Sequence, residues 1–426
     1  MRISYGLLLL MLLALDSLAQ NNRIDMMRPD APQLALFGPH PVGVTTLRAS
    51  DMNRVDVLST AVGGEPARYD RTLTLEVWYP ASPEPGTQPG ELYQTQTRNP
   101  AIEATLIGRA MRDVAPLISL QPYPLVILSH GYPGNRFLMS HLGENLASKG
   151  YVVASIDHLE STYDDQADFA STLFHRTLDQ RFVIQHLATT SASPDNFLFG
   201  VVDTQTVGMV GYSMGGFGLM NNLGAGYNPA LINSPSAPPN GLLAEHTELN
   251  TGFRAGLDTR IKAGVAIAPW GMNHAMWRAE DVQKIKTPTL YVSGSLDITS
   301  GYDNGTRLLF DLARNSDRYL LTFDNASHSA GAPIPVPIEL LNSADGVGVD
   351  HYTDPVWDTL RMNNIMDHFV TAFFDYRLKG MQARLSYLQL PPNSAQGWLG
   401  FENGPAHGLR LEHHGLGEPL APDVDQ

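Results

Sequence analysis

The sequence predicts an α/β fold in which a mostly parallel central sheet is flanked by helices. Short, continuously apolar runs such as residues 125–128 and 151–156 have the pattern of strands that are buried on both faces. Stretches with apolar residues at helical spacing, such as residues 135–149, alternate with these runs. This order implies βαβ units that are joined by right-handed crossovers.

The predicted elements follow from periodicity and from Gly and Pro at their ends. Residues 30–42 are rich in proline and are expected to be an extended lead-in to the first strand. The expected strands are 44–48, 73–79, 125–128, 151–156, 207–210, 263–268, 289–293 and 319–323, and the expected helices are 135–149, 173–187 and 356–378.

Residues 1–19 have the pattern of a signal peptide. Arg2 supplies the positive charge, residues 7–15 the apolar segment, and residues 17–19 the small-x-small cleavage pattern. The apolar run is too short to span a bilayer, and no later stretch is long and apolar enough to do so. The sequence therefore predicts an exported protein, periplasmic or secreted, without a membrane span.

Composition excludes several classes of function. The chain is 43% hydrophobic, which is enough for a sizeable core, and its formal net charge is −15. A strongly acidic balance argues against nucleic acid as a partner. The chain has no cysteine, which excludes disulfides, a cysteine nucleophile and thiolate metal sites.

Residues 207–218, VGMVGYSMGGFG, contain the motif G-x-S-x-G with Ser213 at its centre. An apolar strand precedes the motif and a glycine-rich helix start follows it, as in a nucleophile elbow. In such an elbow the serine sits on a strained turn with its Oγ exposed, and the helix N-terminus suits a developing oxyanion. The sequence predicts that Ser213 is a nucleophile, and the alternative is a chance match in a glycine-rich turn.

A serine nucleophile needs a base, and the base needs an orienting acid. In this arrangement the chain order is Ser, then Asp or Glu, then His, with the later residues on loops after strands. Asp297 follows the predicted strand 289–293, and His328 follows the strand 319–323. We expect Ser213, Asp297 and His328 to form a catalytic triad, with Asp303 and Asp324 as the competing acids.

The oxyanion hole is expected to use two backbone N–H groups. One belongs to Met214, the residue after the nucleophile, and the other to Tyr132 in the loop SHGYPG that follows the strand 125–128. His130 and His158 also follow strands but precede the serine in the chain, so we expect both to have structural roles.

Four segments together resemble the dienelactone hydrolase and platelet-activating-factor acetylhydrolase-like branch of the α/β-hydrolases. They are the elbow GYSMGG, the loop SHGYPGNR, the strand KGYVVASIDH and the N-terminal pattern FGPHPVG…LEVWYP. The resemblance spans residues 32–378 and implies the α/β-hydrolase fold, with Ser213, Asp297 and His328 matching the triad and Tyr132 and Met214 matching the oxyanion donors.

The chain departs from that branch in two respects. Dienelactone hydrolases use a cysteine nucleophile, and the acetylhydrolases place their acid where this chain has Ala268. An acid at Asp297 instead resembles cutinase-like polyester hydrolases, as do the SMGG elbow and a tyrosine after the oxyanion-loop glycine. That resemblance implies that Trp270 flanks the acyl pocket as a substrate-binding residue, and the alternative for Trp270 is core packing.

The expected organisation is a signal peptide at 1–19, a catalytic domain at 20–390 and a loop-like C-terminal tail at 391–426. Residues 221–260 contain several prolines and glycines and are expected to be an insertion after the nucleophile helix, with a lid over the site as one interpretation. His413 and His414 are expected to lie solvated in the tail. No phosphate-binding loop and no H-E-x-x-H zinc motif occurs.

These observations predict an exported serine hydrolase that cleaves carboxylic esters, either small molecules or polymers, without a cofactor or a metal. An amide or peptide hydrolase with the same triad remains an alternative. A non-catalytic binding protein on a hydrolase scaffold is another, although such proteins typically lose a member of the triad. Fold alone does not decide the substrate. The sequence predicts no oligomeric state.

Overall fold

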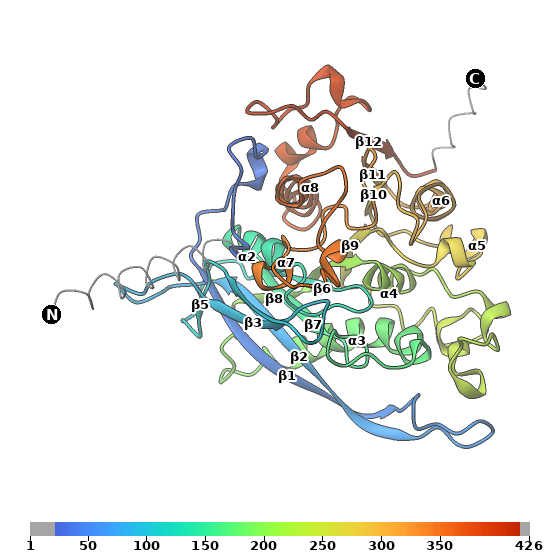
Figure 1. Cartoon of the computed structure of the whole chain (residues 1–426). Coiled ribbons are helices and arrows are strands. Elements are labelled where there is room, and N and C mark those ends of the chain that lie inside the picture. Colours follow the sequence, from blue (N-terminus) through green and yellow to red (C-terminus); the bar gives the residue numbers. More distant parts are fainter. Residues whose placement is uncertain (1–21, 418–426) are drawn as a thin grey trace, which may run out of the picture.

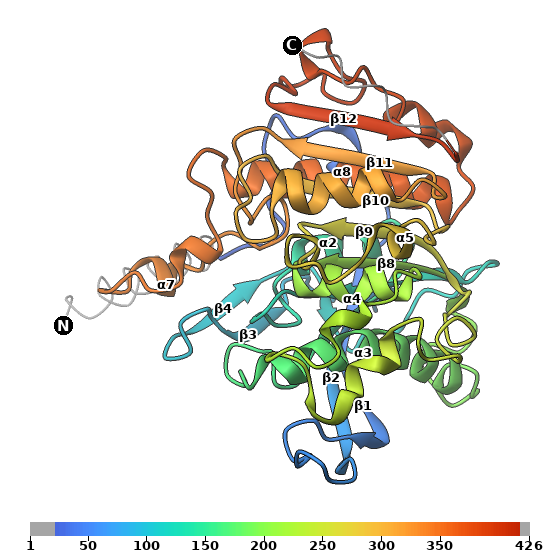
Figure 2. The same ribbon diagram turned by 90° about the vertical axis from the view of Figure 1, so that its right-hand side faces the viewer.

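A ten-stranded sheet forms the centre of the molecule (Figures 1 and 2). The computed structural model describes residues 22–417, so the predicted signal peptide at 1–19 lies outside the described residues. The order of the strands across the sheet is β12-β11-β10-β9-β8-β6-β7-β2-β1-β5, and β3 and β4 pair separately as a hairpin.

The strands are β1 (Val42–Val55), β2 (Arg68–Pro80), β3 (Leu92–Gln96), β4 (Glu103–Ile107), β5 (Met111–Arg112), β6 (Tyr123–Ser129), β7 (Val152–Asp157), β8 (Val202–Tyr212), β9 (Ile261–Ile267), β10 (Thr289–Gly294), β11 (Arg318–Phe323) and β12 (Leu409–His414). The helices are α2 (Ser140–Ser148), α3 (Phe169–Thr190), α4 (Met214–Asn222), α5 (Ala279–Val282), α6 (Arg307–Leu312), α7 (Ile338–Leu341) and α8 (Thr359–Arg377).

The six strands from β7 through β6, β8, β9 and β10 to β11 pair in parallel, which confirms the predicted parallel core. Both faces of this core are covered. In β6, Leu125 and Ile127 pack in the same cluster as residues of α3 and α4, whereas Val126 and Leu128 pack with residues of α2 and α8. The continuous apolar runs in the sequence follow from this two-sided burial.

The predicted strands are all present, but β1 and β2 are much longer than expected. They pair antiparallel along almost their whole length and extend beyond the rest of the sheet (Figure 1). The hairpin of β3 and β4 was not predicted, although both strands alternate exposed and buried residues over part of their length. These two strands are short, and the polar residues Gln94, Gln96 and Glu103 mask their apolar pattern.

The prediction of a loop-like tail is wrong for residues 409–414. This segment is β12, which pairs antiparallel with β11 and forms the edge of the sheet. Leu409 and Leu411 are buried against the core, at 1% and 2% exposure. His413 is exposed, as expected, but its ring stacks on Tyr319 with centroids 4.3 Å apart and its Nε2 contacts Asp317 at 2.7 Å. A six-residue strand at the edge of a sheet has only a weak local sequence pattern, so its pairing with β11 determines its conformation.

The parallel strands bring several loops to one edge of the sheet. The residues that follow β6, β8, β10 and β11 leave the carboxyl ends of neighbouring parallel strands, where open α/β sheets collect functional groups. Among the residues that the structure describes, no helix combines the length and the apolar character needed to cross a bilayer.

The docking of β12 can be tested at Leu411. Replacing Leu411 by Ala is expected to lower the free energy of unfolding by about 2–5 kcal/mol, because a buried leucine loses its contacts and leaves a cavity. Leu411→Met keeps most of the volume and should cost less than about 1.5 kcal/mol. Urea unfolding of both variants measures the difference, and equal stability of Leu411→Ala and the unmodified protein would contradict a docked β12.

Candidate active site

Ser213 occupies a tight turn between β8, which ends at Tyr212, and α4, which begins at Met214. Its backbone has φ 51° and ψ −112°, a combination that is strained for any residue other than glycine. A Cβ on Gly211 would collide with the carbonyl oxygen of Gly215, and a Cβ on Gly215 would collide with that of Ser129. Glycine at both places therefore allows the close approach that this turn requires.

Backbone hydrogen bonds hold the strained turn. The N–H of Ser213 donates to the carbonyl oxygen of Ile267 at 2.9 Å, and its own carbonyl oxygen accepts from Phe217 at 2.9 Å and Trp270 at 3.1 Å. The Ser213 residue is 7% exposed and lines a pocket of about 840 Å³. The turn is thus fixed by β9 and α4 while the side chain faces the pocket.

The structure brings Asp297 and His328 together and places His328 in the same pocket as Ser213. His328 Nδ1 lies 3.1 Å from Oδ1 and 3.0 Å from Oδ2 of Asp297, whose side chain is fully buried. Asp297 Oδ1 also accepts from the backbone N–H groups of Thr299 and Ser300 at 2.9 and 3.0 Å. A carboxylate held in this way can orient the imidazole with Nδ1 protonated.

The competing acids are placed elsewhere. Asp303 is exposed, and Asp324 forms an ion pair with Arg410 at 2.8 Å. Both residues follow the right strands in the chain, so the sequence could not distinguish them from Asp297. The hydrogen bonds to His328 make Asp297 the acid that faces the imidazole.

The two predicted oxyanion donors lie beside Ser213. Met214 is the first residue of α4, and Tyr132 lines the pocket with Ser213. A Cβ on Gly131 would lie 3.3 Å from Ser213 Cβ, so the loop after β6 passes directly over the nucleophile. Among residues 22–417, no acceptor bonds to the N–H of Tyr132 or Met214. Both N–H groups are therefore free to bind an oxyanion.

Trp270 does not line the pocket with Ser213. Its ring stacks on His274 with centroids 4.6 Å apart and contacts the edge of Phe169 at 5.3 Å. Phe169 in turn contacts the ring of Tyr132 at 5.2 Å. The ring of Trp270 therefore contacts the pocket wall through Phe169. This position favours the packing alternative over a direct contact with an acyl group.

Two further segments that line the pocket were not predicted. One carries Arg98, in the turn between β3 and β4, and the other is residues 347–355, between α7 and α8. Alternating residues in 92–96 and 103–107 are a signal that could have located the hairpin. Residues 347–355 contain one short 3-10 helix, Val349–His351, and no periodicity, so only their docking against Arg98 and Tyr163 reveals their role.

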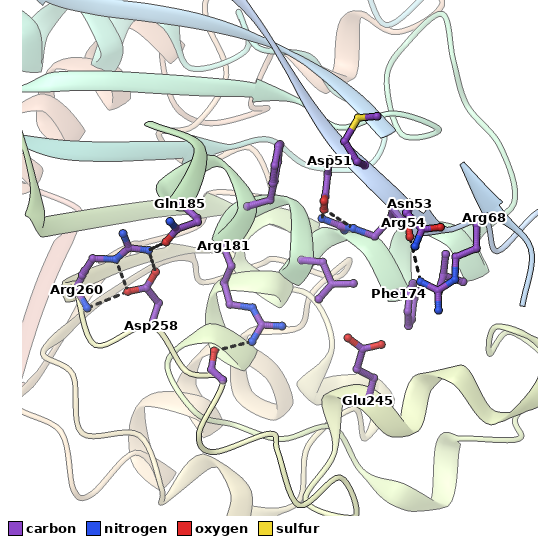
Figure 3. A pocket seen from close by; sticks show the side chains of 15 residues that line it. Asp51, Asn53, Arg54, Arg68, Phe174, Arg181, Gln185, Glu245, Asp258 and Arg260 are labelled. Carbon is purple, nitrogen blue, oxygen red and sulfur yellow. Dashed lines mark hydrogen bonds and ion pairs between the residues drawn. The ribbon is translucent and has the colours of Figure 1, made fainter. Parts of the chain in front are cut away.

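The segment 221–260 does not line this pocket, so the lid interpretation is not supported by its position. Beyond the end of α4 it forms two 3-10 helices, Pro229–Leu231 and Pro239–His246, and a series of turns. Residues 245–260 instead border a separate groove of about 710 Å³ beside α3 and the β1–β2 hairpin (Figure 3). In that groove Arg181 donates to the carbonyl oxygen of Gly256 at 2.9 Å.

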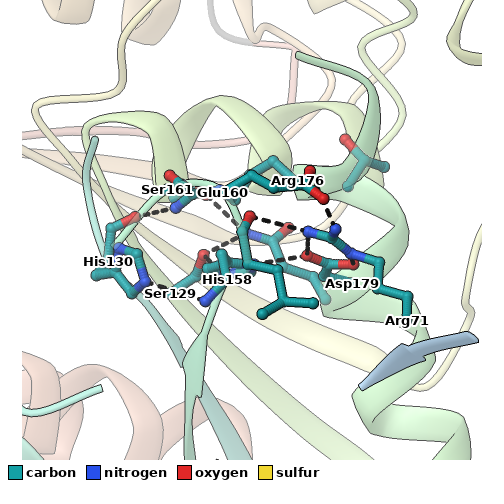
Figure 4. A network of polar contacts seen from close by, with 12 residues as sticks. Arg71, Ser129, His130, His158, Glu160, Ser161, Arg176 and Asp179 are labelled. Carbon is teal, nitrogen blue, oxygen red and sulfur yellow. Dashed lines mark hydrogen bonds and ion pairs between the residues drawn. The ribbon is translucent and has the colours of Figure 1, made fainter. Parts of the chain in front are cut away.

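His158 belongs to a buried polar network below the oxyanion loop (Figure 4). Its Nδ1 contacts Asp179 Oδ2 at 3.1 Å, and its Nε2 accepts from Ser129 Oγ at 2.8 Å. Burial, followed by the nearby Arg176 charge, lowers the pKa of His158 to about 3, so the ring is neutral at physiological pH. Ser129, His158 and Asp179 have the hydroxyl–imidazole–carboxylate contacts of a serine triad, but all three are at most 1% exposed.

The same network holds the loop that carries Tyr132. Arg176 from α3 donates to the carbonyl oxygens of His130 and Gly131, the latter at 3.3 Å. Gln180, one turn further along α3, donates to Ser129 Oγ and to the carbonyl oxygen of Gly215, both at 2.9 Å. Helix α3 is thus hydrogen-bonded both to the oxyanion loop and to the elbow.

Asp179 anchors this network to β2. Arg71 donates to both carboxylate oxygens of Asp179, at 2.9 and 3.0 Å, and the two side chains are 1% exposed. Burial alone would raise the pKa of Asp179, but Arg71 and His158 hold it well below the ordinary value of 3.8. The carboxylate is therefore ionised in the folded protein.

No group of three or more His, Cys, Asp or Glu side chains suited to a metal ion occurs among residues 22–417. The chemistry offered by the site is that of a serine, an imidazole, a carboxylate and two free N–H groups. This combination is the arrangement used for acyl transfer.

Comparisons with known proteins find similarity to ester hydrolases. A family model described as PET hydrolase-like matches residues 117–241. Cutinase est1 of Thermobifida alba is 25% identical over 209 residues, which cover 49% of this chain and 54% of the cutinase. Cutinase 2 of Thermobifida cellulosilytica is 24% identical over 209 residues and 61% of its length. The chain thus spans roughly half the length of the curated relatives it matches.

Among solved structures, a ferulic acid esterase from Streptomyces cinnamoneus superimposes with a TM-score of 0.58 at 19% identity. The superposition covers 93% of this chain and all of the esterase chain. The chain has the α/β-hydrolase fold. The predicted resemblance to cutinase-like polyester hydrolases is confirmed by the cutinase and PET hydrolase-like matches.

The contribution of Asp179 is testable through pH. Asp179→Asn is expected to lower the free energy of unfolding at pH 7 by about 3–5 kcal/mol, because it leaves the buried Arg71 without a charge partner. An aspartate whose pKa is depressed by folding adds stability above its unfolded value, and this addition is lost as pH falls below about 4. The deficit of the variant, measured by urea unfolding, should therefore be full at pH 7 and shrink below pH ~4.

The matched control is Asp195→Asn, because Asp195 is exposed. This control should unfold like the unmodified protein at every pH. A deficit in Asp179→Asn that stays constant from neutral to acid pH would contradict the ionised pair.

Proposed function

We propose that this chain is an exported serine hydrolase that cleaves carboxylic esters through Ser213, His328 and Asp297. The observation that carries the proposal is the pocket that the strained Ser213 and His328 line together, with Asp297 at hydrogen-bond distance from Nδ1 of the imidazole. The similarity to cutinases and to PET hydrolase-like proteins favours esters over other acyl substrates.

In the proposed reaction His328 Nε2 removes the proton from Ser213 Oγ as that oxygen attacks the ester carbonyl carbon. Asp297 accepts the hydrogen bond from Nδ1–H, which fixes the tautomer and stabilises the imidazolium. The oxyanion of the tetrahedral intermediate lies between the N–H groups of Met214 and Tyr132. His328 then returns its proton to the leaving alcohol, and an acyl-enzyme remains.

Water completes the cycle. His328 removes a proton from water, whose oxygen attacks the acyl carbon, and the imidazolium then protonates Ser213 Oγ as the acid leaves. No step requires a cofactor or a metal. The substrate is a small-molecule or polymeric ester, and we propose that Trp270 supports the Tyr132 wall through Phe169.

The proposed export rests on the sequence of residues 1–19. Cleavage after Ala19 would release a protein that begins at Gln20.

The nucleophile is tested by hydrolysis of 4-nitrophenyl acetate, butyrate and octanoate. Ser213→Ala is expected to lower kcat by about 10⁶-fold and to abolish the burst of nitrophenol, because no acyl-enzyme forms. Ser329→Ala, which removes a second hydroxyl from the same pocket, is the control and should retain the burst. Equal rates for Ser213→Ala and the unmodified protein would reject the serine mechanism. Faster turnover of the matching 4-nitroanilides would instead favour the amidase alternative.

The acid is tested by comparing two aspartates. Asp297→Asn is expected to lower kcat by about 10⁴-fold with little change in KM, because the imidazole loses its correct tautomer and its charge partner. Asp303→Asn changes an exposed side chain in the same stretch and should leave kcat within about twofold. A larger loss in Asp303→Asn than in Asp297→Asn would assign the role to the competing acid.

A further inference from the structure

Arg98 lines the active-site pocket on a firmly held turn. The turn joins β3 to β4, and the N–H of Thr97 donates to the carbonyl oxygen of Ile102 at 3.1 Å. The N–H of Ile102 closes the turn by donating to the carbonyl oxygen of Asn99 at 2.9 Å. The backbone that carries Arg98 is therefore fixed by local hydrogen bonds.

Residues 347–355 hold Arg98 from the other side. The backbone N–H of Arg98 donates to the hydroxyl of Tyr352 at 3.1 Å. A Cβ on Gly348, whose φ is +89°, would lie 2.9 Å from Arg98 Cβ and 3.0 Å from Cγ, so the aliphatic part of Arg98 lies directly on the Gly348 backbone. The guanidinium is thus presented to the pocket by two segments that are far apart in the chain.

The guanidinium of Arg98 has no partner of its own. Within the described part of the chain, no carboxylate lies within ion-pair distance of Arg98, and its side-chain N–H groups meet no acceptor. Arg112 and Arg136, in the same region of the fold, each pair with two carboxylates. A half-buried arginine in a pocket with unused N–H groups is suited to bind a planar anion in a bidentate manner.

The acidic residues of the pocket do not form ion pairs with Arg98. Asp354 Oδ2 accepts from the N–H and the hydroxyl of Ser327, both at 2.6 Å, and Oδ1 accepts from two further backbone N–H groups. Asp350 is exposed and forms no ion pair with Arg98. The chain carries a net charge of −15, and its overall field repels anions. The unpaired charge of Arg98 offsets this repulsion within the pocket.

The charge of Arg98 acts close to the catalytic imidazole. His351 lies between α7 and α8, and its Nε2 contacts the hydroxyl of Tyr163 at 2.9 Å. Burial, together with the nearby charges of Arg98 and His328, lowers the pKa of His351 to about 3. His351 is therefore neutral, and both Arg98 and His328 lie near enough to influence it.

The exposed residues that line the pocket include two apolar side chains beside the polar Thr299 and Asp350. Ile298, next to Asp297, is 93% exposed, and Val347 is 55% exposed. These apolar side chains together with the unpaired guanidinium fit a substrate with an apolar chain and a charged end.

We propose that Arg98 binds a free carboxylate of the substrate, remote from the ester carbonyl that Ser213 attacks. The substrate class is thus an ester that carries a second, ionised carboxyl group, such as a monoester of a dicarboxylic acid. This proposal rests on the proposed ester hydrolysis and adds a preference for anionic esters, against the negative charge of the whole protein.

The test compares charged and neutral esters of the same shape. Mono-4-nitrophenyl adipate and suberate, each beside its methyl ester, place the carboxylate on the acyl side. Acetoxybenzoate, beside its methyl ester, places the carboxylate on the leaving-group side. The pair with the larger charge preference in kcat/KM identifies which side of the ester faces Arg98.

Arg98→Gln is expected to raise KM for the preferred charged ester by about 10-fold or more, because the charge-assisted hydrogen bonds are lost. Its neutral methyl ester should change by no more than about twofold, and Arg98→Lys should restore part of the preference. Arg48→Gln is the matched control, because Arg48 is exposed and its loss changes the net charge equally.

Two outcomes would overturn the proposal: no preference of the unmodified protein for either charged ester, or an equal loss on charged and neutral esters in Arg98→Gln. Binding of monomethyl adipate to Ser213→Ala, measured by calorimetry with and without Arg98→Gln, gives a second readout that needs no turnover. Hydrolysis of the neutral esters that depends on Ser213 but shows no charge effect would reject the role of Arg98 alone. Hydrolysis that persists in Ser213→Ala would reject the proposed function itself.

Discussion

The close approach of the elbow to the end of β6 is the constraint on which the rest of the site depends. A Cβ on Gly215 would collide with the carbonyl oxygen of Ser129, and one on Gly211 with that of Gly215. Without these side chains, α4 starts directly beside β6 and the loop after β6 crosses over Ser213. The strained φ of 51° at Ser213 and the two free N–H groups are both consequences of this contact.

Polar groups buried behind the site keep this approach in place. Arg71, Asp179, His158 and Ser129 form a continuous chain of contacts from β2 to the end of β6. Arg176 and Gln180 extend it from α3 to the carbonyl oxygens of the oxyanion loop and the elbow (Figure 4). Buried charges of this kind are costly unless every member is paired, so the network favours one arrangement of the loop over others.

The pocket in front of Ser213 is lined by segments of two different origins. The catalytic wall comes from loops after parallel strands, which the fold brings to one edge of the sheet. The rest of the lining includes the turn that carries Arg98 and residues 347–355, which contact each other through Tyr352 and Gly348. The catalytic residues thus lie on loops of the common fold, whereas these two segments, which line the same pocket, lie outside the parallel core.

The sequence by itself determined the parallel core, because strands buried on both faces must be continuously apolar, as 125–128 and 151–156 are. It also located Ser213, because G-x-S-x-G between a strand and a helix has a local steric cause. The placement of Asp297 and His328 after strands was predicted, but their contact, at 3.0 Å, depends on neighbouring strands β10 and β11.

Tertiary structure alone decided the features without a local signal. Strand β12 is fixed by its pairing with β11, and the segment 221–260 packs away from the pocket. The ring of Phe169 lies between Trp270 and Tyr132. Arg98 resembles any surface arginine in the sequence. Its unpaired position in the pocket becomes visible when residues 347–355, about 250 positions away, fold against it, because long-range contacts are not encoded in local periodicity.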